Sequence, residues 1–117
     1  MSTNTTAIDP SQTYVHLDAD GAAQTVAGGE AFWGLPEAQI DRFGRDWMIS
    51  EFECSADWPR WEMHPLADEF VYLLSGAAEL ILELPQGRKV VTLSERAAVI
   101  VPRGVWHTAH VLAPSRM

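Results

Sequence analysis

Cysteine and basic residues are scarce in this sequence, and each shortage excludes a class of protein. A single Cys cannot form an internal disulfide framework and fits a reducing compartment. Only 8 Lys and Arg oppose 16 Asp and Glu, and the formal charge of −8 argues against nucleic acid or an anionic membrane as the main partner. No apolar run approaches the ~20 residues that span a bilayer. The N-terminus, MSTNTTAIDPSQ, lacks the basic start and apolar stretch of a signal peptide. We expect a soluble, acidic, cytoplasmic protein.

The apolar content is sufficient for one folded domain. Hydrophobic residues make up 47% of the 117, five of them Trp, which supplies enough surface for a core. The length suits one domain and is too short for two. Residues 1–13 are rich in Ser, Thr, Asn and Gln and are expected to form a flexible arm, with residues 14–117 as the single domain.

The segment before residue 46 is expected to contain one short strand and one helix. Residues 14–17 alternate as a strand does and are followed by the turn-like sequence Asp-Ala-Asp-Gly. A short helix is expected over residues 36–43, because Pro36 suits a first helical turn and Gly44 suits a C-terminal cap.

From Asp46 onward the pattern changes to short strands separated by turns. The expected strands are residues 47–54, 60–64, 69–74, 77–84, 88–93, 97–101 and 105–112. Seven short strands at this spacing indicate an all-β sandwich or barrel.

Four polar side chains beside these turns form a candidate site. Glu62 and His64 are two residues apart on one strand, so they share a face, about 6–7 Å apart. Glu69 opens the next strand, and His107 follows a turn on a distant one. If the sheets close into a barrel, the four groups converge. Two imidazoles and two carboxylates suit Fe(II), Mn(II), Zn(II), Ni(II) or Co(II). Without a metal the carboxylates repel, and the group could transfer protons.

The same residues resemble the two sequence motifs of the cupin family. Glu62-Met63-His64, four residues, Glu69, six residues and Gly76 resemble the first motif, and Pro102-x-Gly104-(two)-His107 resembles the second. Together they cover about residues 56–111. The resemblance implies a double-stranded β-helix, or jelly-roll barrel, with a divalent metal at its mouth held by Glu62, His64, Glu69 and His107. It also implies a homodimer.

This sequence departs from the family pattern at four positions. Ala56 and Arg96 stand where each motif begins with Gly, Val111 replaces a final Asn, and Glu62 replaces the first His. A carboxylate still binds a divalent ion, and its extra negative charge should favour Fe(II) or Mn(II) over softer ions.

Three functions fit these residues, and the first of them is the one we predict. The first is a mononuclear non-haem metal enzyme, dioxygenase-like, that acts on a small organic substrate and uses Glu62 and His107 in catalysis. The second is a non-catalytic small-molecule-binding or sensor module. The third is a metal-free acid–base isomerase that uses the same two residues.

Other conspicuous residues are assigned structural roles. His110 has the opposite strand parity to His107 and is expected to face away from the site, as are Trp61 and Trp106. His16 is expected to be solvated and Cys54 to be a small buried hydrophobe. An apolar face for dimer formation is expected from Phe70, Tyr72 and Trp106.

The two ends of the chain carry one further expectation. Cupin barrels usually have another strand after the one that bears the second His, yet only residues 113–117 follow the last expected strand. Either the N-terminal arm fills that edge, from this chain or a partner subunit, or the chain is truncated.

Overall fold

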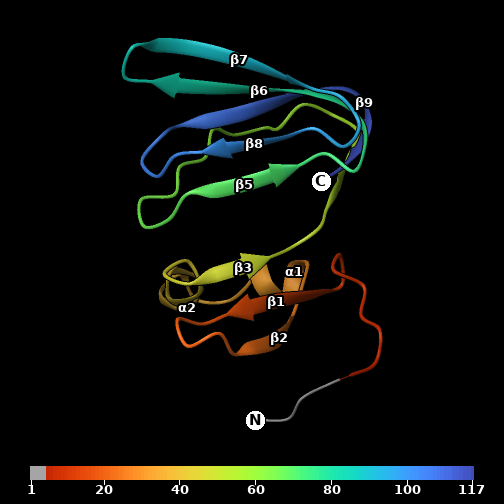
Figure 1. The fold of residues 1–117 in the computed structure, drawn as a ribbon, viewed down its shortest axis with the longest axis vertical. Helices are drawn as coiled ribbons and strands as arrows, with labels where there is room; N and C mark the ends of the chain where they lie inside the picture. The colour runs from red at the N-terminus through yellow and green to blue at the C-terminus, as the bar shows by residue number, and fades with distance from the viewer. Residues whose placement is uncertain (1–4) are drawn as a thin grey trace. The chain divides into compact units, whose positions relative to one another are not determined.

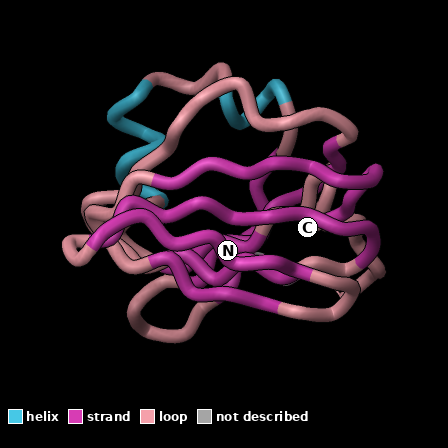
Figure 2. The backbone as a smooth tube through the Cα atoms, turned by 90° about the horizontal axis from the view of Figure 1, so that it is seen from above, coloured by secondary structure: helices cyan, strands magenta, loops and turns pink. Residues whose placement is uncertain are grey.

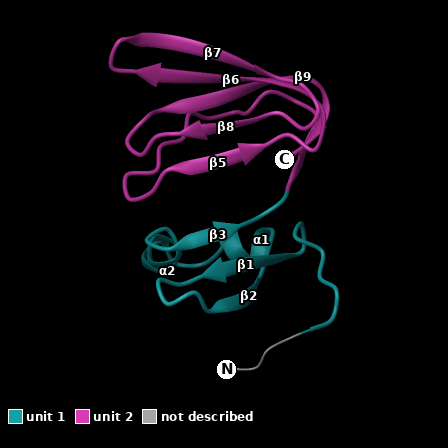
Figure 3. Ribbon diagram, viewed as in Figure 1, with its two compact units in different colours: residues 1–51 teal, residues 52–117 magenta. Residues whose placement is uncertain are grey.

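The computed structural model describes residues 5–117. They fold into short antiparallel strands and two short helices, joined by loops (Figure 1). Residues 1–4 of the predicted arm lie outside this range; residues 9–12 form a turn, and Thr13 already begins a strand. The chain divides into two units, residues 1–51 and 52–117 (Figure 3). Figure 2 distinguishes the strands from the helices. No helix among the described residues is long and apolar enough to cross a membrane.

The first unit is a three-stranded antiparallel sheet with two helices. Its strand order is β2–β1–β3, from β1 (Thr13–Leu17), β2 (Ala23–Ala27) and β3 (Trp47–Ile49). The predicted helix is present as α2 (Glu37–Phe43), between Pro36 and Gly44. The sequence pattern missed β2 and the single-turn α1 (Glu30–Trp33), which is too short to show helical periodicity. Phe32 of α1 is buried against Tyr14 of β1, with ring centroids 5.4 Å apart.

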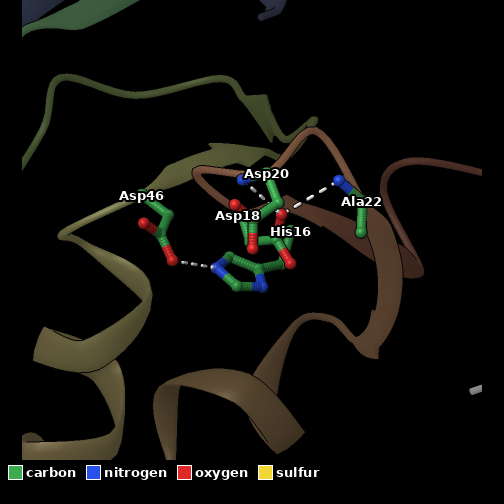
Figure 4. Close-up of polar contacts among 5 residues, drawn as sticks. All are labelled: His16, Asp18, Asp20, Ala22 and Asp46. Carbon is green, nitrogen blue, oxygen red and sulfur yellow. Dashed lines mark hydrogen bonds and ion pairs between the residues drawn. The ribbon is translucent and has the colours of Figure 1, made fainter.

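The prediction that His16 is solvated is wrong. Its Nε2 lies 2.9 Å from Asp46 Oδ2 (Figure 4). Its ring packs edge-on against Phe43, and only 13% of its side chain is exposed. Pairing of β1 with β3 places His16 opposite Met48, and so brings Asp46, 30 residues away, beside the ring. That partner is visible only in the tertiary structure.

The second unit holds two antiparallel sheets with an apolar core. The larger sheet has the order β4–β9–β6–β7, from β4 (Glu53–Cys54), β6 (Ser75–Leu84), β7 (Gly87–Leu93) and β9 (His107–Arg116). The smaller pairs β5 (Glu69–Tyr72) with β8 (Ala98–Val101). The buried core comes from inward-facing residues of both sheets and the adjoining turns: Val71, Leu73, Ala78, Leu80, Leu82, Leu93, Val101, Val105, Ala109 and Met117. The strand-rich content and antiparallel sheets agree with the predicted all-β class.

Several strand boundaries differ from the prediction. The expected strand 47–54 is interrupted, and its two parts, β3 and β4, belong to different units. The expected strand 60–64 is reduced to one bridge, between Glu62 and His107, because Pro59 and Pro65 on either side have no N–H for a ladder. The last strand is longer than expected: β9 runs to Arg116, and its end pairs with β4.

Gly76 is required by the packing of β6 against the end of β9. Its φ is +98°, and the ladder shifts register between Ser75 and Ala77. An added Cβ would lie within 3.0 Å of the Pro114 carbonyl oxygen and Ser115 Oγ. This position therefore needs glycine for both its backbone conformation and its lack of a side chain.

We predict that Gly76→Ala lowers the free energy of unfolding by about 3 kcal/mol, the sum of a strained backbone and a steric clash. Urea unfolding followed by Trp fluorescence measures it. The matched control is Gly87→Ala, where φ is also positive, at +130°, but no atom lies within 4 Å of the new Cβ. Equal losses in the two variants would contradict the role assigned to the contact with β9.

Candidate functional site

A backbone bridge places Glu62 beside His107. The Glu62 N–H donates to the His107 carbonyl and the His107 N–H donates to the Glu62 carbonyl, both at 2.8 Å. In such an antiparallel pair the two side chains project from the same face. The short segment around Glu62 is thereby held on the edge of β9 although it forms no extended strand.

A second set of contacts joins the turn before His107 to the segment that carries His64. The Gly104 N–H donates to the His64 carbonyl at 2.8 Å. Asp68 Oδ1 accepts hydrogen bonds from the Arg103 backbone N–H at 2.9 Å and from its Nε at 3.3 Å. These bonds, chiefly the one from the backbone N–H, lower the pKa of the Asp68 carboxyl. Asp68 therefore joins the two motif segments, beyond any role in its own turn.

Glu69 lies between the two imidazoles. Its Oε2 is 3.1 Å from His64 Nε2 and its Oε1 is 3.0 Å from His107 Nε2. The ring centroids of the two histidines are 5.6 Å apart. One ligand atom each from Glu62, His64 and His107 lie within 4.8 Å of one another. The structure thus brings together all four residues that the sequence proposed for the site.

Three of these atoms are buried without a hydrogen bond in residues 5–117: His64 Nε2, Glu69 Oε1 and His107 Nε2. Both nitrogens lie within ion-pair distance of the Glu69 carboxylate, but neither contact qualifies as a hydrogen bond. His107 Nδ1 donates to the Val105 carbonyl at 3.1 Å, which in the neutral ring leaves the Nε2 lone pair facing Glu69. Buried polar atoms without hydrogen bonds are costly, and a divalent cation could bind all three. The donor set therefore fits a metal ion.

The electrostatics of the cluster favour charge on all three groups. Burial would raise the pKa of Glu69, but His107 and His64 outweigh it and lower that pKa to about 2. The Glu69 carboxylate raises the pKa of His64. Burial of His107 opposes its protonation, yet the same carboxylate and the Val105 carbonyl raise its pKa. A proton and a cation thus compete for the same two nitrogens.

Trp58 lies beside the buried imidazole of the cluster and contacts Phe52 in turn. The Trp58 ring meets His107 edge-on, with centroids 6.2 Å apart, and Phe52 lies 5.9 Å from Trp58. No sequence motif marks Trp58 as a neighbour of His107. Cys54 packs partly buried against the core, and burial raises the pKa of its thiol, as expected for an unreactive cysteine.

The residues expected to face away from the site are exposed. His107 is fully buried, whereas His110, three residues later on β9, is exposed. Trp61 and Trp106, each adjacent to a site residue, are also exposed. On β9, strand alternation therefore separates the buried His107 from the exposed His110, as predicted.

Comparisons with known proteins found one family and one similar structure. The family model described as "Cupin domain" matches residues 48–117. A cupin-2 domain-containing protein from Shewanella frigidimarina NCIMB 400 is structurally similar, with a TM-score of 0.49 and 17% sequence identity. The similarity covers 56% of this chain and 60% of that one. No curated protein matches the sequence. Because the family model spans more than half of the residues, including both motifs, the chain belongs to the cupin family.

Proposed function

We propose that this cupin binds one divalent transition metal through His64, Glu69 and His107, with Glu62 beside it as a fourth ligand or as a proton acceptor. The observation that carries this proposal is the convergence of His64 Nε2, His107 Nε2 and Glu69 Oε1, all buried and without hydrogen bonds among the described residues. Their spacing needs no rearrangement of the backbone, since hydrogen bonds already hold the segments together.

The donor chemistry favours iron or manganese. Two imidazoles and one or two carboxylates are hard to borderline ligands, which suit Fe(II) and Mn(II) better than Cu(I). When bound, such an ion supplies a Lewis acid with open positions for a small molecule. The protein supplies a buried side formed by the core and Trp58, and an exposed side with Glu62.

As the activity of this site we propose dioxygenase-like chemistry on a small organic substrate. Two histidines and one carboxylate on one face of a metal are the ligand pattern of non-haem Fe(II) oxygenases. Glu62 lies near the two imidazoles and its side chain is exposed, so it can accept a proton from an incoming substrate.

We expect the purified protein to bind one Fe(II) or Mn(II) per chain and to become more heat-stable when it does, because the metal binds only the folded site. Calorimetric titration of chelator-treated protein measures the affinity. His64→Ala should weaken it more than about 100-fold, since loss of a direct ligand exceeds the loss of an outer partner. His110→Ala, on the opposite face of β9, is the matched control and should leave it unchanged.

Repeating the metal titration at several pH values checks that the two imidazoles are the ligands. The pKa values of His64 and His107 are raised. At a pH below these pKa values both imidazoles are protonated, and the metal must displace their protons. The affinity should therefore fall as pH drops from 8 to 6. Binding that is independent of pH, or that survives His64→Ala, would place the metal elsewhere.

Turnover distinguishes an oxygenase from the two other functions. We expect oxygen consumption by the Fe(II)-loaded protein with at least one member of a panel of small phenols and carboxylic acids. Chelation should abolish it. Glu62→Gln should slow it by about 100-fold, the usual contribution of a proton acceptor, while metal binding persists. Turnover that survives chelation would support the acid–base isomerase, and substrate binding without turnover would support the sensor module.

We further propose that two copies pair through the outer face of β5 and β8. Phe70 and Ile100 are cross-strand partners there and are 60% and 62% exposed, an apolar pair that isolated sheets seldom leave in water. Tyr72 lies two residues further along the same face.

We predict a dimer by light scattering at micromolar concentration and a monomer for Phe70→Lys, because a charge cannot be buried in an apolar contact. Val90→Lys replaces an exposed apolar residue of β7 and serves as the control. A monomeric wild-type protein, or a dimer in the Phe70→Lys variant, would refute the pairing.

A further inference from the structure

A hollow lies on the face of the larger sheet opposite to the side chain of His107. Its volume is about 280 Å³. Because side chains of a strand alternate between faces, Thr108 and His110 line this hollow whereas His107 and Ala109 point into the core. Ile81, the cross-strand partner of Thr108, completes the floor, and both floor residues are only 6% exposed.

The wall of the hollow is the segment that runs along β9 on its way to Glu62. The Trp58 N–H donates to the Ala109 carbonyl at 3.0 Å, and Thr108 Oγ1 donates to the Arg60 carbonyl at 3.0 Å. Asp57 Oδ1 accepts a hydrogen bond from the Val111 N–H at 2.7 Å. The wall is therefore held to the sheet along its length, and the hollow is formed before any ligand arrives.

Two guanidinium groups line this hollow in a chain whose net charge is −8. Arg88 lies over the Trp61 ring, 5.2 Å from its centroid, and forms an ion pair with Glu83 at 2.5 Å. Arg60 is exposed and makes no ion pair within residues 5–117. One cation is thus fixed against an aromatic ring, and the other is available to an anion.

We propose that this hollow binds a small organic carboxylate. The carboxylate pairs with the Arg60 guanidinium at the rim, and the apolar body lies over Ile81 and against Trp61. A guanidinium binds a carboxylate with two parallel N–H bonds, which a neutral group cannot replace. The volume is close to the lower limit of ligand pockets, roughly 300 Å³, and admits a ligand the size of one aromatic ring with its acid group. The site is separate from the metal ligands, because the Thr108 and His110 side chains that line it project from the face of β9 opposite to His107.

Benzoate is the probe for this site, with benzyl alcohol as its uncharged counterpart. Chelator-treated full-length protein is titrated with each while backbone amide resonances are followed by NMR, so that no metal can recruit the acid. We expect benzoate to shift the amides of Ile81, Thr108 and His110, and benzyl alcohol to leave them in place.

The contribution of the Arg60 charge to benzoate binding is tested with one variant and one matched control. Arg60→Gln should weaken benzoate binding about tenfold, as loss of one charge-assisted contact does. Lys89→Gln removes the same charge from β7, one residue beyond Arg88 and on the opposite face, and should bind as the wild type does.

Three results would overturn the proposal. One is equal affinity of Arg60→Gln and wild type, with both folded by circular dichroism. Another is equal binding of benzyl alcohol. The third is a set of shifts confined to residues around His64 and Glu69, which would assign the acid to the metal-ligand cluster instead.

Discussion

The antiparallel bridge between Glu62 and His107 is the contact on which both sites of this protein depend. Two hydrogen bonds of 2.8 Å hold the segment before Pro65 against the first residue of β9. On the inner side they bring a carboxylate beside a buried imidazole. On the outer side the same segment, bonded to β9 through Arg60 and Trp58, forms the wall of the hollow. A single line of backbone pairing thus shapes both faces of the sheet, because side chains along β9 alternate between them.

Burial and the neighbouring imidazoles shift the pKa of Glu69 in opposite directions, and the imidazoles have the larger effect. Removal of Glu69 from water disfavours its ionised form, but the two neighbouring imidazoles lower its pKa to about 2. The result is a carboxylate that stays ionised throughout the physiological range between two nitrogens of raised basicity. An arrangement of this kind is poor as an apolar core and well suited to hold a cation, since the carboxylate is already ionised and each imidazole can release its proton.

The replacement of the usual first histidine by Glu62 changes the charge of the site more than its shape. The bridge to His107 is formed by backbone atoms and so does not depend on which side chain stands at residue 62. The carboxylate occupies the exposed side of the cluster, where solvent lowers the cost of a second negative charge close to Glu69. Both ionised carboxylates would be offset by one divalent ion, which connects this substitution to the expected preference for hard metals.

Much of this structure was predictable from local sequence, and what was not depended on distant partners. Pro36 and Gly44 bound α2 as predicted, and strand parity on β9 correctly separated the exposed His110 from the buried His107, because period and cap chemistry are local properties. The motif spacing indicated all four residues of the cluster. It did not show that His16 is paired with Asp46, nor that Arg60 lines a hollow.

The sequence by itself therefore determined the all-β class and the identity and order of the groups that can bind a cation. The tertiary structure decided which of those groups meet and in what protonation state, because a distance of 3.0 Å between Glu69 and His107 arises only when strands 38 residues apart are brought together. Spacing along a strand sets which face a side chain occupies. The pairing of strands sets which other side chains it contacts on that face.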